Sequence, residues 1–207
     1  MTTTLKLHRF TLSGHSHRAE LMLSMLQLDY EAIDVDFLGG AHKQPAFIDK
    51  NVFAEVPVLE DGEVVIPDSN AILVYLAAAY DPDRTWLPTD PVRAAAVQRF
   101  LSAAAGPIAS GPATARLVTV FGAPLDHEAA MDRANRFLVP FDALLANRDY
   151  LVGEPTIADV ACYSYLAHAP EGGVSLEPYA NVQAWLRRIE GWRHFVPMPK
   201  SAAGLRA

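Results

Sequence analysis

The chain has 207 residues, of which 51% are hydrophobic and 20% charged, and its formal net charge is −7. This length fits one large domain or two small ones, and the composition is that of a globular protein. The acidic balance argues against nucleic acid or an anionic membrane as a partner. A single cysteine, Cys162, excludes a disulfide framework and a cysteine-rich zinc site.

The beginning of the sequence, MTTTLKLHRF, lacks the apolar core of a secretory signal peptide. The longest uninterrupted apolar run covers residues 71–80, about half of what a membrane-spanning helix needs. We therefore expect a cytoplasmic protein that does not associate with a membrane.

The first eighty residues alternate between strand and helix patterns. Residues 5–10 predict a short strand, and apolar residues at helical spacing from Ala19 to Leu26 predict a helix after the turn-rich segment TLSGHS. A second strand is expected at 30–36. Two strands joined through a helix in this way form a right-handed crossover, so the pair should be parallel.

A short helix, a hairpin and a longer helix follow. Pro45 suits the first turn of the short helix. The segment PVLEDGEVVI predicts two strands joined at Asp61 and Gly62, a residue pair typical of tight hairpin turns. Asp68 and Ser69 precede the apolar run of the longer helix. The expected order is βαβ-α-ββα, a small mixed sheet with helices.

The second half of the chain follows a proline-rich linker. Asp90 followed by Pro91 is a suitable helix start. No strand pattern is found beyond it, and alanine-rich helical stretches are expected near 91–105, 113–121, 127–147, 156–168 and 181–190. The predicted organisation is an α/β domain at 1–80, a linker at 81–90 and an all-α domain at 91–207.

The residues best suited to chemistry lie at the start of the first helix. Ser13 and Ser16, with Gly14 and His15 between them, stand where free backbone N–H groups and the helix dipole favour an anion. A serine hydroxyl there can donate to a thiolate and so favour ionisation of a thiol near neutral pH. The alternative is that Ser13 or Ser16 only caps the helix.

A second helix start carries Asp68 and Ser69. The Ser69 hydroxyl can bind a carboxylate and Asp68 can receive an ammonium group, so the pair suits an amino-acid head group. The alternative is again a capping pair. Val56-Pro57 opens a strand, a position at which proline removes no ladder hydrogen bond; sequence alone leaves its isomer open.

Other polar residues are interpreted as structural. Thr156 and Asp159 form a capping-box pattern before an apolar helix, and Cys162 in that helix is expected to be buried. The seven histidines show no metal-ligand spacing, so no metal is expected.

Together these segments resemble the cytosolic glutathione S-transferase family, in a bacterial serine-type, zeta-like form. The resemblance covers nearly the whole chain and rests on SGHSHRAELML at 13–23, GGAHKQPAFIDKNVFAEVPVLEDGEVVIPDSNAILVYL at 39–76 and GEPTIADVACYSYL at 153–166. It implies a thioredoxin-like N-terminal domain, an all-helical C-terminal domain and a homodimer. The apolar face of Ile72, Leu73 and Leu76 leaves room for the dimer interface.

The resemblance also implies roles for individual residues in binding glutathione. Ser13 matches the catalytic serine, with Ser16 as the second candidate, while Asp68 and Ser69 match the γ-glutamyl site. A cis bond before Pro57 is implied, which would turn the Val56 backbone toward the cysteinyl part. Lys43 either reaches the glycine carboxylate or is a solvated surface lysine. The second substrate is expected between the domains, near Ala103, Pro107 and Ser110 with Tyr163 opposite.

The implied function is a glutathione transferase that uses glutathione as co-substrate and directs its thiolate at a small hydrophobic electrophile. The alternatives are a glutathione-dependent disulfide reductase or peroxidase, or a non-catalytic glutathione-binding scaffold. His15 falls where cysteine-type members carry their cysteine. The chain also departs from the family where Asn-Pro-x-Gly is usual, because residues 51–54 read Asn-Val-Phe-Ala, and Glu55 replaces a common Gln or Lys.

Overall fold

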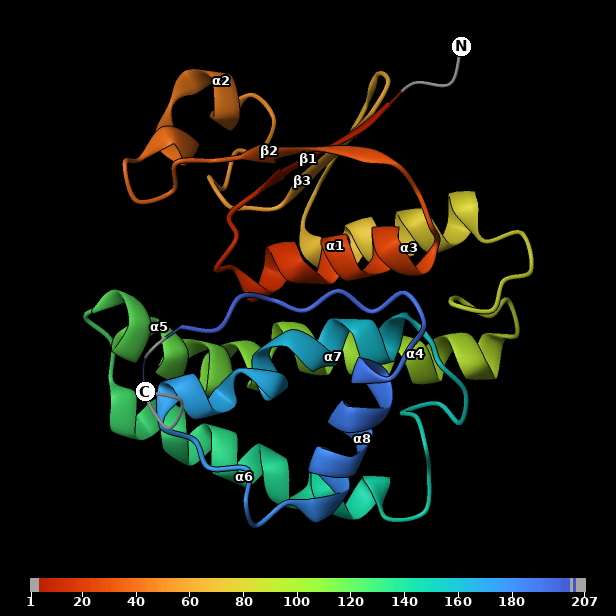
Figure 1. The fold of residues 1–207 in the computed structure, drawn as a ribbon, viewed down its shortest axis with the longest axis vertical. Coiled ribbons are helices and arrows are strands. Elements are labelled where there is room, and N and C mark those ends of the chain that lie inside the picture. Colours follow the sequence, from red (N-terminus) through yellow and green to blue (C-terminus); the bar gives the residue numbers. More distant parts are fainter. Residues whose placement is uncertain (1–3, 202, 204–207) are drawn as a thin grey trace.

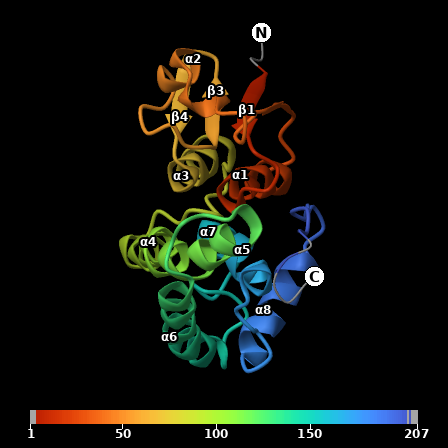
Figure 2. The same ribbon diagram turned by 90° about the vertical axis from the view of Figure 1, so that its left-hand side faces the viewer.

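The computed structural model describes residues 4–201 and 203, and it places an α/β layer on a helical layer (Figures 1 and 2). The sheet forms the outer part of the α/β layer. Helices α1 (Gly14–Met25) and α3 (Ser69–Tyr80) lie between the sheet and the helical half. The N-termini of α1 and α3 are therefore positioned by both halves of the molecule.

The sheet has four strands in the order β2-β1-β3-β4, namely β1 (Leu5–Arg9), β2 (Tyr30–Asp34), β3 (Val58–Asp61) and β4 (Val64–Pro67). β1 and β2 are parallel, as the crossover predicted, and the other two pairs are antiparallel. Leu7 pairs with Leu59 and both belong to the core shared with the helices. Val58 belongs to a second apolar cluster with Phe47 of α2 (Pro45–Ile48), so both faces of the sheet are covered.

The hairpin turn lies one residue beyond its expected position. Asp61 still pairs with Val64, so Gly62 and Glu63 form the turn and Gly62 adopts a left-handed φ of 59°. The carboxylate of Asp61 accepts hydrogen bonds from the hydroxyls of Tyr75 and Tyr80 on α3. These bonds hold Asp61 in the strand.

The helical half contains α4 (Pro91–Ala105), α5 (Thr114–Phe121), α6 (His127–Leu145), α7 (Ile157–Ala167) and α8 (Ala180–Glu190). Each agrees with its expected range to within about two residues, and Asp90 caps α4 by accepting from the Arg93 N–H. Sequence patterns did not predict the π-helical turn at Ala109–Ala113 or the 3₁₀ turns at Ala41–Lys43 and Ala169–Gly172.

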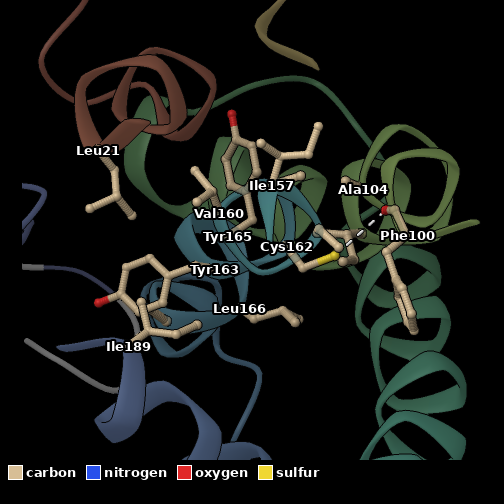
Figure 3. Close-up of a cluster of buried hydrophobic side chains, with 14 of the residues drawn as sticks. Leu21, Phe100, Ala104, Ile157, Val160, Cys162, Tyr163, Tyr165, Leu166 and Ile189 are labelled. Atoms are coloured by element: carbon tan, nitrogen blue, oxygen red, sulfur yellow. Dashed lines mark hydrogen bonds between the residues drawn. The ribbon is translucent and has the colours of Figure 1, made fainter. Parts of the chain in front are cut away.

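Helix α7 forms the centre of the helical half, and every one of its residues is buried (Figure 3). The capping box of Thr156 and Asp159 is present as expected, and the Asp159 carboxylate also accepts from the Trp185 indole N–H at 2.9 Å. Cys162 is fully buried, as expected, and burial raises the pKa of its thiol. Its sulfur lies 3.6 Å from the carbonyl oxygen of Phe100 on α4.

The apolar face expected to form a dimer interface is instead part of the core. Ile72, Leu73 and Leu76 are fully buried within the chain, because they pack against the same cluster as α1 and α7. The side of α3 that remains exposed carries Ala71 and Val74. It borders a groove of about 620 Å³ between α3 and α4.

Candidate active site

The N-terminus of α1 distinguishes the two candidate serines. Ser13 is the N-cap residue, partly exposed, and its hydroxyl accepts from the Ser16 backbone N–H at 3.2 Å. The side chain of Ser16 is fully buried, and its hydroxyl accepts from the Phe10 N–H at 3.1 Å. Ser13 therefore caps the helix and is still accessible to a ligand. The Ser16 hydroxyl, by contrast, is buried against the loop that precedes the helix.

The N-terminus of α3 lies against that of α1. Asp68 caps α3 by accepting from the Ala71 N–H at 2.8 Å, with an exposed side chain and an unusual backbone φ of 79°. The hydroxyl of Ser69, which is 3% exposed, lies 3.1 Å from Nδ1 of His15. The structure thus brings together the two helix starts that the sequence singled out separately.

A buried arginine, Arg18, bonds a residue at the start of each of these two helices. Nη1 of Arg18 donates to His15 Nδ1 at 2.9 Å and to the Ser69 hydroxyl at 3.2 Å. Because a guanidinium only donates, His15 Nδ1 is an acceptor and the ring carries its proton on Nε2. Burial, aided by the charge of Arg18, lowers the pKa of His15 to about 3, so the ring is neutral at pH 7.

Arg18 itself is fully buried, and none of the ion pairs among the described residues includes it. Its Nε and Nη2 atoms have no hydrogen-bond partner in the same part of the chain. Its Cζ atom lies 5.5 Å from the centre of the Tyr165 ring. The N-termini of α1 and α3 therefore share a buried positive charge in addition to their helix dipoles.

Tyr165 of α7 reaches this site from the helical half. Its ring packs edge-on against the His15 ring, with 5.0 Å between the ring centres. A Cβ atom at Gly14 would lie 2.8 Å from the Tyr165 ring, so glycine permits this close approach. Sequence reasoning missed Tyr165 because an aromatic residue in an apolar helix has the pattern of a core residue.

A second connection from the helical half fixes the loop before Ser13. Nη1 of Arg116 on α5 donates to the Leu12 carbonyl at 2.8 Å, and its Nε donates to Glu171 at 2.6 Å. Burial tends to raise the pKa of Glu171, but hydrogen bonds from Ser201, Arg116 and His168 outweigh it and lower that pKa to about 2. The carboxylate therefore stays charged and keeps Arg116 on the loop.

The remaining expected ligand-binding residues lie on the sheet side of the site. The Val56–Pro57 bond is cis, the isomer that the resemblance implies, and both residues are buried. Lys43 is exposed at the end of the 3₁₀ turn. Ala54 adopts a left-handed φ of 55° at the place where the family usually has glycine.

The residues expected to form a second-substrate pocket do not come together as a group. Pro107 and Ser110 are exposed and Ala103 is partly exposed, but Tyr163 is buried and its hydroxyl donates to Glu190 of α8 at 3.0 Å. Its ring packs against His17 and Phe195 because its position on α7 turns it toward α8 and the chain that follows. The geometry gives no support to Tyr163 as a wall opposite the other three.

Partly buried aromatic rings lie next to the Ser13 loop instead. Phe10 stacks on Phe37 at 5.6 Å between ring centres and lies 6.0 Å from Phe121 of α5. These rings come from both halves of the chain, so only the folded structure brings them together.

Within residues 4–201 and 203, no group of three or more His, Cys, Asp or Glu side chains is arranged to hold a metal ion. No helix in this part of the chain is long and apolar enough to cross a membrane.

Comparison with known proteins agrees with this geometry. The family model for the glutathione S-transferase N-terminal domain matches residues 3–78, and that for the C-terminal domain matches residues 113–191. Glutathione S-transferase 3 of Zea mays is 34% identical over 202 residues, covering 89% of this chain and 88% of the maize protein.

Solved structures give the same result. A glutathione S-transferase from Pseudomonas fluorescens superposes with a TM-score of 0.89 at 31% identity, covering 95% of this chain and 99% of its own. A glutathione transferase homologue from Drosophila mojavensis, solved with bound glutathione, superposes with a TM-score of 0.85 at 25% identity. That match covers 93% of this chain and 90% of the fly protein.

Proposed function

The chain belongs to the glutathione S-transferase family and is a glutathione transferase, and we propose that Ser13 stabilises the glutathione thiolate. The observation that carries this assignment is the junction of the two helix starts, where His15 contacts Ser69 at 3.1 Å. Glutathione bound with its γ-glutamyl head at Ser69 has its sulfur near Ser13 at the N-terminus of α1. A serine hydroxyl, free N–H groups and a helix dipole all favour a thiolate there.

The other contacts follow from the same placement. Asp68 receives the ammonium group of the γ-glutamyl head, and Ser69 donates to its carboxylate. The backbone of Val56 beside Pro57 pairs with the cysteinyl part, and Lys43 attracts the glycine carboxylate. Ser16 is the weaker candidate for activating the thiol, because its buried hydroxyl already accepts from Phe10.

The glutathione thiolate is the nucleophile in this reaction, so the protein contributes binding, orientation and charge stabilisation rather than a covalent intermediate. The second substrate is a small hydrophobic electrophile held between the halves. The rings of Phe10, Phe37 and Phe121 supply an apolar wall beside Ser13. Ala103, Pro107 and Ser110 are the remaining candidates on the helical side.

The proposal extends to subclass and assembly. We assign the chain to a bacterial serine-type, zeta-like group, acting in the cytoplasm as a two-fold homodimer. The exposed groove between α3 and α4 is the surface proposed for the dimer contact. The domains are taken as residues 1–80 and 91–207, with 81–90 as the linker.

The test is a titration of the bound thiol in the wild type, Ser13→Ala and Ser16→Ala, followed by the ultraviolet absorbance of the thiolate. We expect Ser13→Ala to raise the thiol pKa by about one unit or more, which corresponds to 1.36 kcal/mol per unit. Ser16→Ala should leave the thiol pKa unchanged. Binding of S-methylglutathione should be the same in Ser13→Ala and wild type, because a thioether has no charge to stabilise.

A shift in Ser16→Ala alone would move the role to Ser16, and no shift in either variant would leave it to the backbone amides. Parallel assays with a halogenated aromatic, a disulfide and a hydroperoxide separate transferase activity from the reductase and peroxidase alternatives. Activity only on the disulfide or the hydroperoxide would contradict transfer to an electrophile.

A further inference from the structure

The ring of His15 has one nitrogen bonded within the chain and one that is free. Its Nδ1 lies 2.9 Å from Nη1 of Arg18 and 3.1 Å from the hydroxyl of Ser69. Its Nε2 makes no hydrogen bond with the described residues, yet it is not one of their buried polar atoms without a partner, because His15 is partly exposed. Nε2 is therefore accessible to a ligand.

Arg18 determines which of the two nitrogens carries the proton. A guanidinium only donates, so Nδ1 accepts from it and the proton of the neutral ring stays on Nε2. Arg18 is fully buried and also donates to the Ser69 hydroxyl at 3.2 Å, so it is held in this position. Burial and the Arg18 charge lower the pKa of His15 to about 3, so at neutral pH the ring is a donor with a single N–H group.

The direction of this N–H group follows from the shape of the ring. The two nitrogens of an imidazole point to different sides, so with Nδ1 facing Ser69 at the start of α3, Nε2 points away from Ser69. His15 is the second residue of α1 and lies two residues after Ser13. The Tyr165 ring projects from α7 toward α1 (Figure 3) and packs against the imidazole at 74°, which limits its rotation. The free N–H group therefore belongs to the part of the site away from the proposed head group.

We propose that His15 is a second catalytic donor for glutathione transfer, whose Nε2–H donates to the glutathione sulfur beside the Ser13 hydroxyl. This inference rests on the proposed function, in which glutathione extends from Ser69 to Ser13. A hydrogen bond to a thiolate favours the charged form over the thiol. The thiol proton leaves to solvent and His15 keeps its own proton, so the ring acts as a donor and not as a base.

The contact with Arg18 makes this donor stronger. Hydrogen bonds in a chain polarise one another, so donation from a charged guanidinium into Nδ1 strengthens the bond that Nε2–H makes in turn. The buried charge of Arg18 thus acts on the sulfur through a neutral ring, while the same nitrogen holds Ser69 for the head group.

The experiment compares His15→Asn with His15→Gln. Asparagine places its amide oxygen near the position of Nδ1, so Arg18 keeps an acceptor, but it has no donor at the position of Nε2. Glutamine reaches that position with its amide nitrogen. We expect His15→Asn to raise the pKa of the bound thiol by about half a unit or more, roughly a threefold loss of thiolate below the pKa. His15→Gln should keep the thiol pKa of the wild type, and neither variant should change the binding of S-methylglutathione.

A matched control and a second readout complete the test. His127→Asn should leave the thiol pKa unchanged, because Nε2 of His127 bonds the Gly172 carbonyl at 2.8 Å in the helical half, outside the site. In the ¹⁵N-labelled protein, the magnetic resonance signals lost in His15→Asn should show a proton on Nε2 that shifts when glutathione binds and shifts less with S-methylglutathione. A proton on Nδ1 would overturn the inference.

The outcomes separate this inference from the proposed function. A raised thiol pKa in Ser13→Ala with none in His15→Asn overturns the role of His15 and leaves that of Ser13 intact. Equal rises in His15→Asn and His15→Gln also overturn it, because the imidazole would then matter for packing and not as a donor. An unchanged thiol pKa with a lower kcat/KM in His15→Asn overturns it too, since Nε2–H would then act on the second substrate. A rise in His15→Asn with none in Ser13→Ala contradicts the proposed role of Ser13 and supports that of His15.

Discussion

Nη1 of Arg18 donates to the hydroxyl of Ser69 over 3.2 Å and so ties the buried side of α1 to the first residue of α3. The same nitrogen donates to His15, whose Nδ1 lies 3.1 Å from the Ser69 hydroxyl. The proposed head-group site is therefore built on a buried cation without an ion-pair partner among the described residues. Burying such a charge costs free energy unless a bound anion offsets it.

Replacing Arg18 by methionine should weaken the binding of glutathione without lowering the stability of the protein. An apolar side chain of similar length removes the cost of a buried unpaired charge, while His15 and Ser69 keep their contact with each other. We expect the free energy of unfolding of the ligand-free protein to stay equal or rise by about 1 kcal/mol or more. The dissociation constant of glutathione should rise roughly tenfold or more, because the bound peptide loses its attraction to the Arg18 charge. A tenfold rise corresponds to about 1.4 kcal/mol of binding free energy. Calorimetry and thermal unfolding measure both, and a large loss of stability with unchanged affinity would assign Arg18 a purely structural role.

Ser69→Ala should weaken glutathione binding without changing the ionisation of the bound thiol. The Ser69 hydroxyl is proposed to bond the γ-glutamyl carboxylate, and a hydrogen bond to a charged group contributes about 1.5–3 kcal/mol. The dissociation constant should therefore rise roughly ten- to hundredfold. Ser175→Ala is a suitable control, because the Ser175 hydroxyl accepts only a local bond from the Glu177 N–H. An altered thiol pKa in Ser69→Ala would show that the residue acts on the sulfur as well.

His17 should make the protein less stable in mild acid. Its Nε2 bonds the Val196 carbonyl and its Nδ1 bonds the Ser164 hydroxyl, both at 2.8 Å. Burial, with help from the charges of His168 and Arg18, lowers the pKa of His17 from 6.5 to about 4. The unfolded state therefore binds more protons between these values, so stability rises with pH across this window and is lost on acidification.

The full effect of that shift is about 3 kcal/mol at 1.36 kcal/mol per unit. Denaturant unfolding at a series of pH values from 7 down to 4 measures it. His17→Gln cannot titrate, so its stability should depend less steeply on pH than that of the wild type. Equal pH dependence in the two proteins would contradict the assignment.

Ala54→Gly should stabilise the protein. Ala54 adopts a φ of 55°, a left-handed conformation that costs a residue with a Cβ atom about 1–2 kcal/mol. Glycine adopts it freely but loses more chain entropy on folding, so we expect a net gain of about 0.5–1 kcal/mol. Ala95→Gly, at an exposed position within α4, is the control, and it should lower the free energy of unfolding by about 0.5–1 kcal/mol. Thermal unfolding of both variants decides the matter, and a loss in Ala54→Gly would mean that its methyl group makes contacts that outweigh the strain.

The elements of this fold could be predicted because their ends are marked by local chemistry. Asp90 caps α4, and Thr156 caps α7, each through a side-chain bond that reaches no more than three residues along the chain. The hairpin was displaced by one residue because Asp61 is held by two tyrosines of α3, which no local pattern reveals. Apolar spacing also cannot tell a core face from an interface, and Ile72 with its neighbours proved to be core.

The site was predictable only in part for the same reason. Ser13, Asp68 and Ser69 stand at helix starts, so their position alone drew attention. Arg18 is a basic residue in an amphipathic helix, where exposure is usual, yet it is fully buried. Its role depends on contacts with another helix, which come from folding rather than from sequence spacing.

The helical half contacts the loop at Leu12 and the helix that follows it at three points: Arg116 donates to the Leu12 carbonyl, the Tyr165 ring packs against His15, and the Ser164 hydroxyl bonds His17. The position of the loop and helix at Leu12 therefore depends on residues of both halves. Recombination that joined this α/β half to the helical half of a distant relative would exchange the phenol, the guanidinium and the serine together. Such a chimera would keep the bond between Arg18 and Ser69 within the α/β half and would lose the three contacts that position the loop and helix at Leu12.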